Sequence, residues 1–139
     1  MIVNAILNTK YQEAISKHIV FVFKVNDLSR IGIDDEDLVV VLVNLLNNAI
    51  EACEKCEEKK IIKFKFMVED ELIILSVKNT YNQPLVYDND EIRTSKTVEP
   101  EAHGVGIKNI IRIVEKYEGE YVIQDNDKEF YFSLIIPIK

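Results

Sequence analysis

LVVVLVNLLNNAIEACEKC, residues 38–56, is the segment around which the rest of the chain is organised. Its apolar residues recur at helical spacing over about five turns, which predicts a long helix with one side facing a core. Acidic residues just before it suit the positive end of a helix, and Asp34 is placed as its N-cap. The valines also favour a buried strand, but the length of the periodic pattern favours the helix. The core-facing residues are Leu38, Leu42, Leu45, Leu46, Ala49, Ile50 and Cys53.

Asparagines gather along one side of this predicted helix. Asn44 and Asn48 are four residues apart, so their side chains are neighbours on consecutive turns. They lie at the edge of the apolar face, whereas Asn47 lies further round, toward solvent. A single asparagine is most often simply solvated, but a pair at this spacing beside a packed surface predicts the floor of a cleft.

Residues 44–52, NLLNNAIEA, resemble the N box of the GHKL superfamily, which includes histidine kinases and gyrase-type ATPases. The resemblance implies that Asn48 coordinates a Mg²⁺ ion that bridges the phosphates of ATP, and a carboxamide oxygen suits this hard cation. The hydrolases of the superfamily carry a water-activating glutamate where this chain has Asn44. Because Asn44 cannot act as a base, the resemblance favours a kinase-type module over an ATPase.

Composition and charge bound the remaining possibilities. The 139 residues predict one domain, residues 1–139, and the net charge of −7 argues against a broad nucleic-acid surface. A local cluster of cations and helix N-termini can still bind an anionic ligand. No apolar run approaches about 18 residues, so no membrane-spanning segment is expected. The first residues lack the basic stretch of a signal peptide, and we therefore expect a cytoplasmic chain with no direct membrane contact.

The two cysteines, Cys53 and Cys56, form a CxxC pair. A zinc site needs further ligands nearby, and the two histidines, His18 and His103, lie far away in sequence. A redox pair usually opens a helix, whereas this pair ends one. We therefore expect Cys53 in the core and Cys56 as a reduced, half-exposed thiol.

The other apolar patterns predict two further helices and five strands. The strand over 18–24 would begin at His18, a structural residue rather than a phosphoacceptor. A tight turn at 69–71 would join two strands as an antiparallel hairpin. The predicted helices are 4–17 and 104–117, the latter with Gly119 as its C-cap, and the strands are 18–24, 61–68, 72–78, 120–124 and 129–138.

A long polar stretch, residues 79–102, precedes the last helix. Loops of this length in a compact domain are often functional lids, although a disordered excursion remains the alternative. Gly104 and Gly106 follow at the helix start, where glycines let a backbone approach closely and free N–H groups point at an anion. A lone GxG is common at such joins, so its position after a long loop and an N box carries the argument.

Residues 103–110, HGVGIKNI, resemble the second glycine box of GHKL proteins, which contacts the ATP phosphates. The resemblance implies that residues 86–102 form an ATP lid. Lys108 either adds positive charge or is a solvated helix lysine. The residues that would border the triphosphate are His103, Gly104, Val105 and Gly106.

Two positions depart from the superfamily pattern. The first glycine box, whose aspartate binds the adenine amino group, is replaced by NTYNQ, residues 79–83. Asn79 offers only a neutral acceptor, which makes a weaker hydrogen bond than a carboxylate. Glu51 stands where many histidine kinases have a phosphate-facing lysine. These departures, with Lys96 in the segment 94–96 as a further nucleotide-binding residue, resemble the AgrC-like quorum-sensing receptor kinases.

The resemblance covers nearly the whole chain and implies a GHKL (Bergerat) ATP-binding fold. This is an α/β fold, a two-layer α+β sandwich with a mixed, mostly antiparallel sheet of about five strands and helices on one face. The implied function is that of the catalytic domain of a two-component sensor histidine kinase with Mg²⁺ and ATP as cofactors. The phosphoacceptor histidine would lie on the dimerisation helices of a membrane-anchored parent kinase, and a response regulator would be a further partner. An anti-sigma-type protein-serine kinase and a non-catalytic interaction module are the alternatives.

Overall fold

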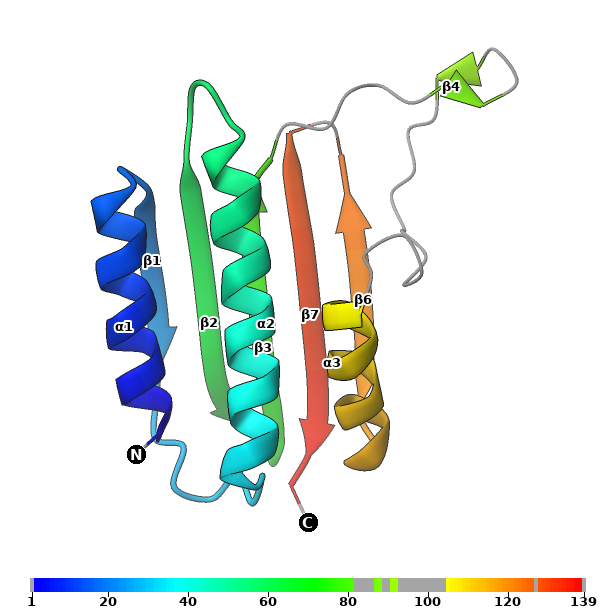
Figure 1. Ribbon diagram of the computed structural model, residues 1–139. Coiled ribbons are helices and arrows are strands. Elements are labelled where there is room, and N and C mark those ends of the chain that lie inside the picture. The colour runs from blue at the N-terminus through cyan, green and yellow to red at the C-terminus, as the bar shows by residue number, and fades with distance from the viewer. Residues whose placement is uncertain (1, 82–86, 89–90, 93–104, 127, 139) are drawn as a thin grey trace.

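The computed structural model describes residues 2–81, 87–88, 91–92, 105–126 and 128–138, arranged in two layers (Figure 1). Helices form one layer and a five-stranded sheet forms the other. The described helices are α1 (Ile2–Ser16), α2 (Asp35–Glu54) and α3 (Val105–Lys116). The strands of the sheet are β1 (Val20–Val25), β2 (Ile61–Glu69), β3 (Leu72–Thr80), β6 (Glu120–Asp125) and β7 (Glu129–Pro137).

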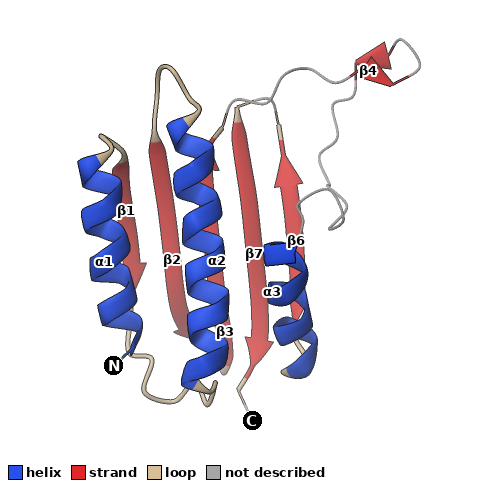
Figure 2. Ribbon diagram, viewed as in Figure 1, coloured by secondary structure: helices blue, strands red, loops and turns tan. Residues whose placement is uncertain are grey.

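The sheet has the strand order β1-β2-β3-β7-β6. Only β1 and β2 are parallel, and the other neighbouring strands are antiparallel. All three described helices lie on the same face of the sheet (Figure 2). The predicted mixed, mostly antiparallel sheet with helices on one face is therefore confirmed.

Part of the predicted polar loop forms a short hairpin. Strands β4 (Tyr87–Asp88) and β5 (Glu91–Ile92) pair with each other and not with the main sheet. Apart from these four residues, the predicted lid over 86–102 lies outside the described residues.

Alternating side chains of the sheet form the core beneath the helices. One row crosses the whole sheet in register, from Phe23 through Phe64, Val77 and Phe132 to Ile123. All of this row except Phe23 is buried. Burial of so much apolar surface is the main force that holds a helical layer on a sheet. All seven residues predicted to face the core from α2 are buried, as is Val41.

Asp34 occupies the N-cap position of α2 as predicted, but its side chain makes no capping hydrogen bond. Instead, the Asp34 carbonyl accepts from the Leu38 amide at 3.0 Å, and the Asp34 amide donates to the Tyr117 hydroxyl at 3.1 Å. The start of α2 is therefore tied to the residue that follows α3.

Two sharp chain reversals differ from the predictions. His18 does not open β1. It adopts a left-handed conformation (φ 60°) just after the end of α1, and the strand begins two residues later, at Val20. Likewise, Glu118 (φ 60°) and not Gly119 is the left-handed residue after α3. Gly119 is required for another reason, since a Cβ there would lie 2.6 Å from the Ile135 carbonyl oxygen.

The predicted hairpin turn after β2 is confirmed, with positive φ at Asp70 and Glu71.

Both cysteines are buried free thiols. Cys53 lies in the core as predicted. The prediction of a half-exposed Cys56 is wrong, because this side chain is only 9% exposed and its Sγ lies 3.6 Å from the Ala52 carbonyl oxygen. Within the described segments, the structure contains no helix with the length and apolar character needed to cross a membrane.

Candidate functional site

Two asparagines of α2, Asn44 and Asn48, lie on the side of the helix that turns toward α3. Asn44 and Asn48 are half-buried at the edge of the apolar face. The Asn44 Nδ2 donates to the Val40 carbonyl oxygen at 2.7 Å, which fixes the rotation of the carboxamide. The Asn44 Oδ1 lies beside Gly106, because a Cβ built at that glycine would be 3.1 Å from this oxygen. The fold thus brings together the two motifs that the sequence places far apart.

Gly106 lies in the first turn of α3, where backbone N–H groups have no partner within the helix. The small residue allows this end of α3 to approach α2 closely. Lys108, two residues further along the helix, is exposed. The free N–H groups and the helix dipole make such an end an anion site. Three other residues predicted to contact the nucleotide, Lys96, His103 and Gly104, lie outside the described residues. The side chain of Val105 is not described either.

Asn79 is the one buried polar residue of the described segments, at 3% exposure. It points to the helix side of β3 near the end of the strand, in register with Ile62 and Phe130. Its Nδ2 donates to the Thr80 carbonyl oxygen at 3.1 Å, which leaves the Oδ1 as an acceptor without a partner in the described chain. A carboxamide oxygen left free in this way can accept a hydrogen bond from a ligand that brings its own N–H donor.

Asp125, which the sequence analysis does not single out, carries a partly buried carboxylate near Asn79. It lies on the same row of the sheet as Asn79, on the far side of Phe130, and its Oδ2 accepts a hydrogen bond from the Tyr81 hydroxyl at 2.5 Å. The Asp125 Oδ1 is buried without a hydrogen-bond partner in the described segments. Alternation along β6 places this carboxylate on the inner face beside Ile123, and that signal was available in the sequence.

Asn47 was predicted to face solvent, and this prediction is wrong. It is half-buried because α1 packs alongside α2 and covers that side of the helix. The Lys10 ammonium of α1 donates to the Asn47 Oδ1 at 2.5 Å and to Glu13 at 3.2 Å. Asn47 therefore joins two helices, whereas Asn44 and Asn48 border the junction with α3.

A polar clamp joins the start of α2 to the end of α3. The Asp37 carboxylate accepts from the Lys116 ammonium at 2.8 Å and from the Tyr117 hydroxyl at 2.5 Å. The bond from Lys116 and then that from Tyr117 hold the pKa of Asp37 below its usual value, and burial raises the pKa of Tyr117. Since α3 runs back along α2, this clamp helps to set the approach of Gly106 to Asn44 at the other end.

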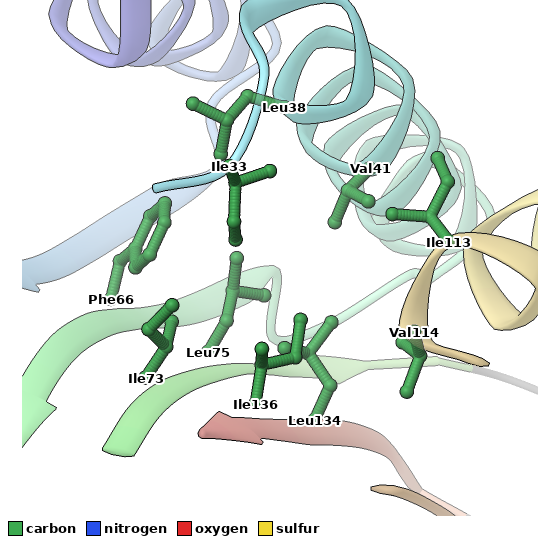
Figure 3. Close-up of a pocket in the computed structure, with 10 residues that line it drawn as sticks. All are labelled: Ile33, Leu38, Val41, Phe66, Ile73, Leu75, Ile113, Val114, Leu134 and Ile136. Atoms are coloured by element: carbon green, nitrogen blue, oxygen red, sulfur yellow. The ribbon is translucent and has the colours of Figure 1, made fainter. Parts of the chain in front are cut away.

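An apolar pocket lies beneath the first turns of α2 (Figure 3). Every side chain that lines it is a hydrocarbon, so it offers no group that would hold a phosphate or a metal ion. It is a gap in the core rather than part of the polar site. Its lining residues are Ile33, Leu38, Val41, Phe66, Ile73, Leu75, Ile113, Val114, Leu134 and Ile136.

Comparison with known proteins identifies the family. The family profile described as GHKL domain matches residues 33–137, which include both asparagine and glycine motifs. The chain belongs to the GHKL family. This GHKL chain is 28% identical over 123 residues to the sensor histidine kinase FlgS of Helicobacter pylori, an alignment that covers 84% of this chain and 30% of FlgS. The chain thus spans under a third of the length of that relative.

Solved structures with the same GHKL fold include the catalytic domain of the histidine kinase ThkA. That domain is 19% identical, with a TM-score of 0.70, and 99% of this chain and 91% of that domain are covered. The complex of ThkA with the response regulator TrrA gives the same identity and TM-score, with 99% and 40% of the chains covered. The Acinetobacter baumannii histidine kinase AdeS is 15% identical, with a TM-score of 0.70 and coverage of 99% and 64%. The predicted GHKL fold is therefore confirmed, and this domain resembles histidine kinase catalytic domains.

Proposed function

We propose that this GHKL domain is the ATP-binding catalytic domain of a two-component sensor histidine kinase. It would transfer the γ-phosphoryl group of Mg²⁺–ATP to a histidine on the dimerisation helices of its parent kinase. The observation that carries the proposal is the juxtaposition of Asn44 with Gly106, which joins the N box to the N-terminus of α3. The similarity to FlgS and to histidine kinase domains supports the same function.

The residues at this junction fit a nucleotide with its metal ion. Asn48 offers a hard oxygen ligand, and Mg²⁺ usually takes few protein ligands and completes its shell with waters and phosphates. The described residues contain no cluster of three or more acidic, histidine or cysteine ligands, so a metal held here would depend on the phosphates. When bound, Mg²⁺ would neutralise charge on the transferring phosphoryl group.

Each predicted site residue has a part in this proposal. Asn79 would accept a hydrogen bond from the adenine amino group through its Oδ1. The backbone N–H groups at the start of α3 would hold the phosphates. With Asn44 in place of a glutamate, the site lacks a base to activate water there, which favours phosphoryl transfer over hydrolysis. The residues around the triphosphate would be Asn44, Lys96, His103, Gly104, Val105, Gly106 and Lys108.

The cellular setting is part of the proposal. The ThkA structure contains a response regulator, and we propose a response regulator as the partner that receives the phosphoryl group from the parent kinase. The degenerate first glycine box and Glu51 support membership of the AgrC-like quorum-sensing branch. The domain would act in the cytoplasm beneath a membrane-anchored sensor, with residues 86–102 as its ATP lid and without contact to nucleic acid or lipid.

Calorimetric titration with a non-hydrolysable ATP analogue, with and without Mg²⁺, tests the proposal. We expect Mg²⁺-dependent binding that Asn48→Ala removes and that the control Asn47→Ala retains, because Asn47 faces α1. The domain alone should not autophosphorylate, since it would need the acceptor histidine of the parent. Absence of binding at millimolar analogue would mean a binding free energy weaker than about −4 kcal/mol. The domain would then be a non-catalytic interaction module with the GHKL fold. Transfer to a partner serine would indicate the anti-sigma type of kinase.

A further inference from the structure

The face of the sheet that points away from the helices carries an unusual grouping of lysines. Alternation along β1, β2 and β3 directs four lysine side chains to this face. The register places Lys24 directly opposite Lys65, and Lys63 directly opposite Lys78. We call Lys24, Lys63, Lys65 and Lys78 the lysine cluster.

The lysine cluster is unfavourable for folding, because like charges directly opposite each other on neighbouring strands repel. Its acidic compensation is slight: Lys65 and Lys78 reach Glu69 and Glu129 at 4.0 and 3.6 Å. Lys24 and Lys63 have neither a hydrogen bond nor an ion pair with any described residue. A chain with 24 acidic and 17 basic residues thus presents a positive surface on one face.

Exposed aliphatic side chains lie on the same face of the sheet as the lysine cluster. Val22 is directly opposite Lys63 and is 53% exposed, and Val20 on the same strand is 54% exposed. Val122 and Ile135, at 47% and 39% exposure, extend the apolar surface across β6 and β7. These apolar groups suit a partner that carries apolar side chains beside its acidic ones.

We propose that this outer face is a docking surface for an amphipathic acidic segment of a partner protein. Carboxylates of the segment would face the lysine cluster, and its apolar side chains would cover Val22 and Ile135. Charge complementarity would relieve the repulsion within the cluster and guide the approach of the partner. The surface is separate from the proposed nucleotide site, because the helices that build that site lie on the opposite face (Figure 2).

An NMR titration of the isotope-labelled chain with a synthetic amphipathic peptide tests the proposal. The peptide has glutamates on one side and leucines on the other. We expect saturable shifts confined to outward residues of β1, β2, β3 and β7, weakened by salt and absent with a peptide in which glutamine replaces glutamate. Lys63→Glu with Lys65→Glu should weaken binding at least about tenfold. The control Lys55→Glu changes an exposed lysine at the end of α2 and should leave affinity unchanged.

A thermal melt of the same double variant gives an independent readout. The substitutions place carboxylates opposite Lys24 and Lys78, so we expect a higher Tm together with lost peptide binding. A lower Tm would show that the lysines serve the fold and would overturn the proposal. Equal binding of the glutamine peptide, or tighter binding of heparin or anionic vesicles than of the acidic peptide, would overturn it as well.

Discussion

At the residue scale, the two glycines at the ends of α3 illustrate two different constraints. A Cβ at Gly106 would meet the end of a side chain, the Asn44 Oδ1 at 3.1 Å, which can move aside. A Cβ at Gly119 would meet backbone, the Ile135 carbonyl oxygen at 2.6 Å, and the Ile136 Cγ1 at 2.7 Å. The first glycine therefore protects the geometry of the site, and the second protects the packing of the fold.

Gly106→Ala should separate function from stability. The methyl group would displace the Asn44 carboxamide from the junction, so we expect weaker binding of Mg²⁺–ATP analogue. Alanine is the better helix former by up to about 1 kcal/mol, so the free energy of unfolding should be unchanged or raised. Calorimetry and urea denaturation measure the two quantities, and unchanged affinity would show that the approach of Gly106 to Asn44 does not matter for the nucleotide.

Gly119→Ala should have the opposite signature. Relief of the contact with Ile135 requires α3 and β7 to move apart, and overpacking of this kind typically costs about 1–3 kcal/mol. Urea denaturation should show this loss, with Glu118→Ala as a neighbouring control. A loss below about 0.5 kcal/mol would mean that the helix end adjusts without strain.

At the scale of the elements, α2 is held from both sides by polar contacts in addition to its apolar face. Lys10 of α1 binds Asn47 on one side, and Asp37 binds Lys116 and Tyr117 of the α3 end on the other. The sequence shows neither link, because each joins residues that are 37 or more positions apart. The orientation of the asparagines is therefore a property of the helix layer and not of α2 alone.

The clamp at Asp37 predicts a pH dependence of stability. The pKa of Asp37 in the folded chain lies below the ordinary value of 3.8, so the unfolded chain binds its proton more readily. The stabilisation is therefore complete above the ordinary value and is lost as the pH falls through the folded pKa. We expect Asp37→Asn to lower the free energy of unfolding at pH 7 and to reduce its decline below pH 4, as denaturation at several pH values would measure; parallel curves would contradict this.

At the scale of the whole molecule, the strand order places β2, β3 and β7 in the interior of the sheet and β1 and β6 at its edges. All three interior strands pair on two sides, and β2 and β3 are also in contact with α2. We therefore predict the slowest hydrogen exchange for amides of the interior strands and faster exchange for β1. Exchange followed by mass spectrometry measures this order, and a β1 as protected as β3 would contradict it.

Much of the fold could be predicted because periodicity survives in the sequence. The core face of α2 follows from the spacing of its leucines, and the β2–β3 hairpin follows from alternation around residues 69–71. The left-handed conformations of His18 and Glu118 could not be predicted, because glycine is the residue usually found in that conformation. The hydrogen bond between Tyr81 and Asp125 joins residues 44 positions apart, so no local pattern in the sequence reveals it.

The place of β7 in the sheet also constrains how the domain is made. The last strand of the described chain, Glu129–Pro137, inserts between β3 and β6 and pairs with both. Until these residues have been synthesised, β6 has no strand to pair with and one edge of β3 lacks its partner. The nucleotide site proposed here would therefore be complete only after β7 is made, so a chain cut short before Glu129 would lack it.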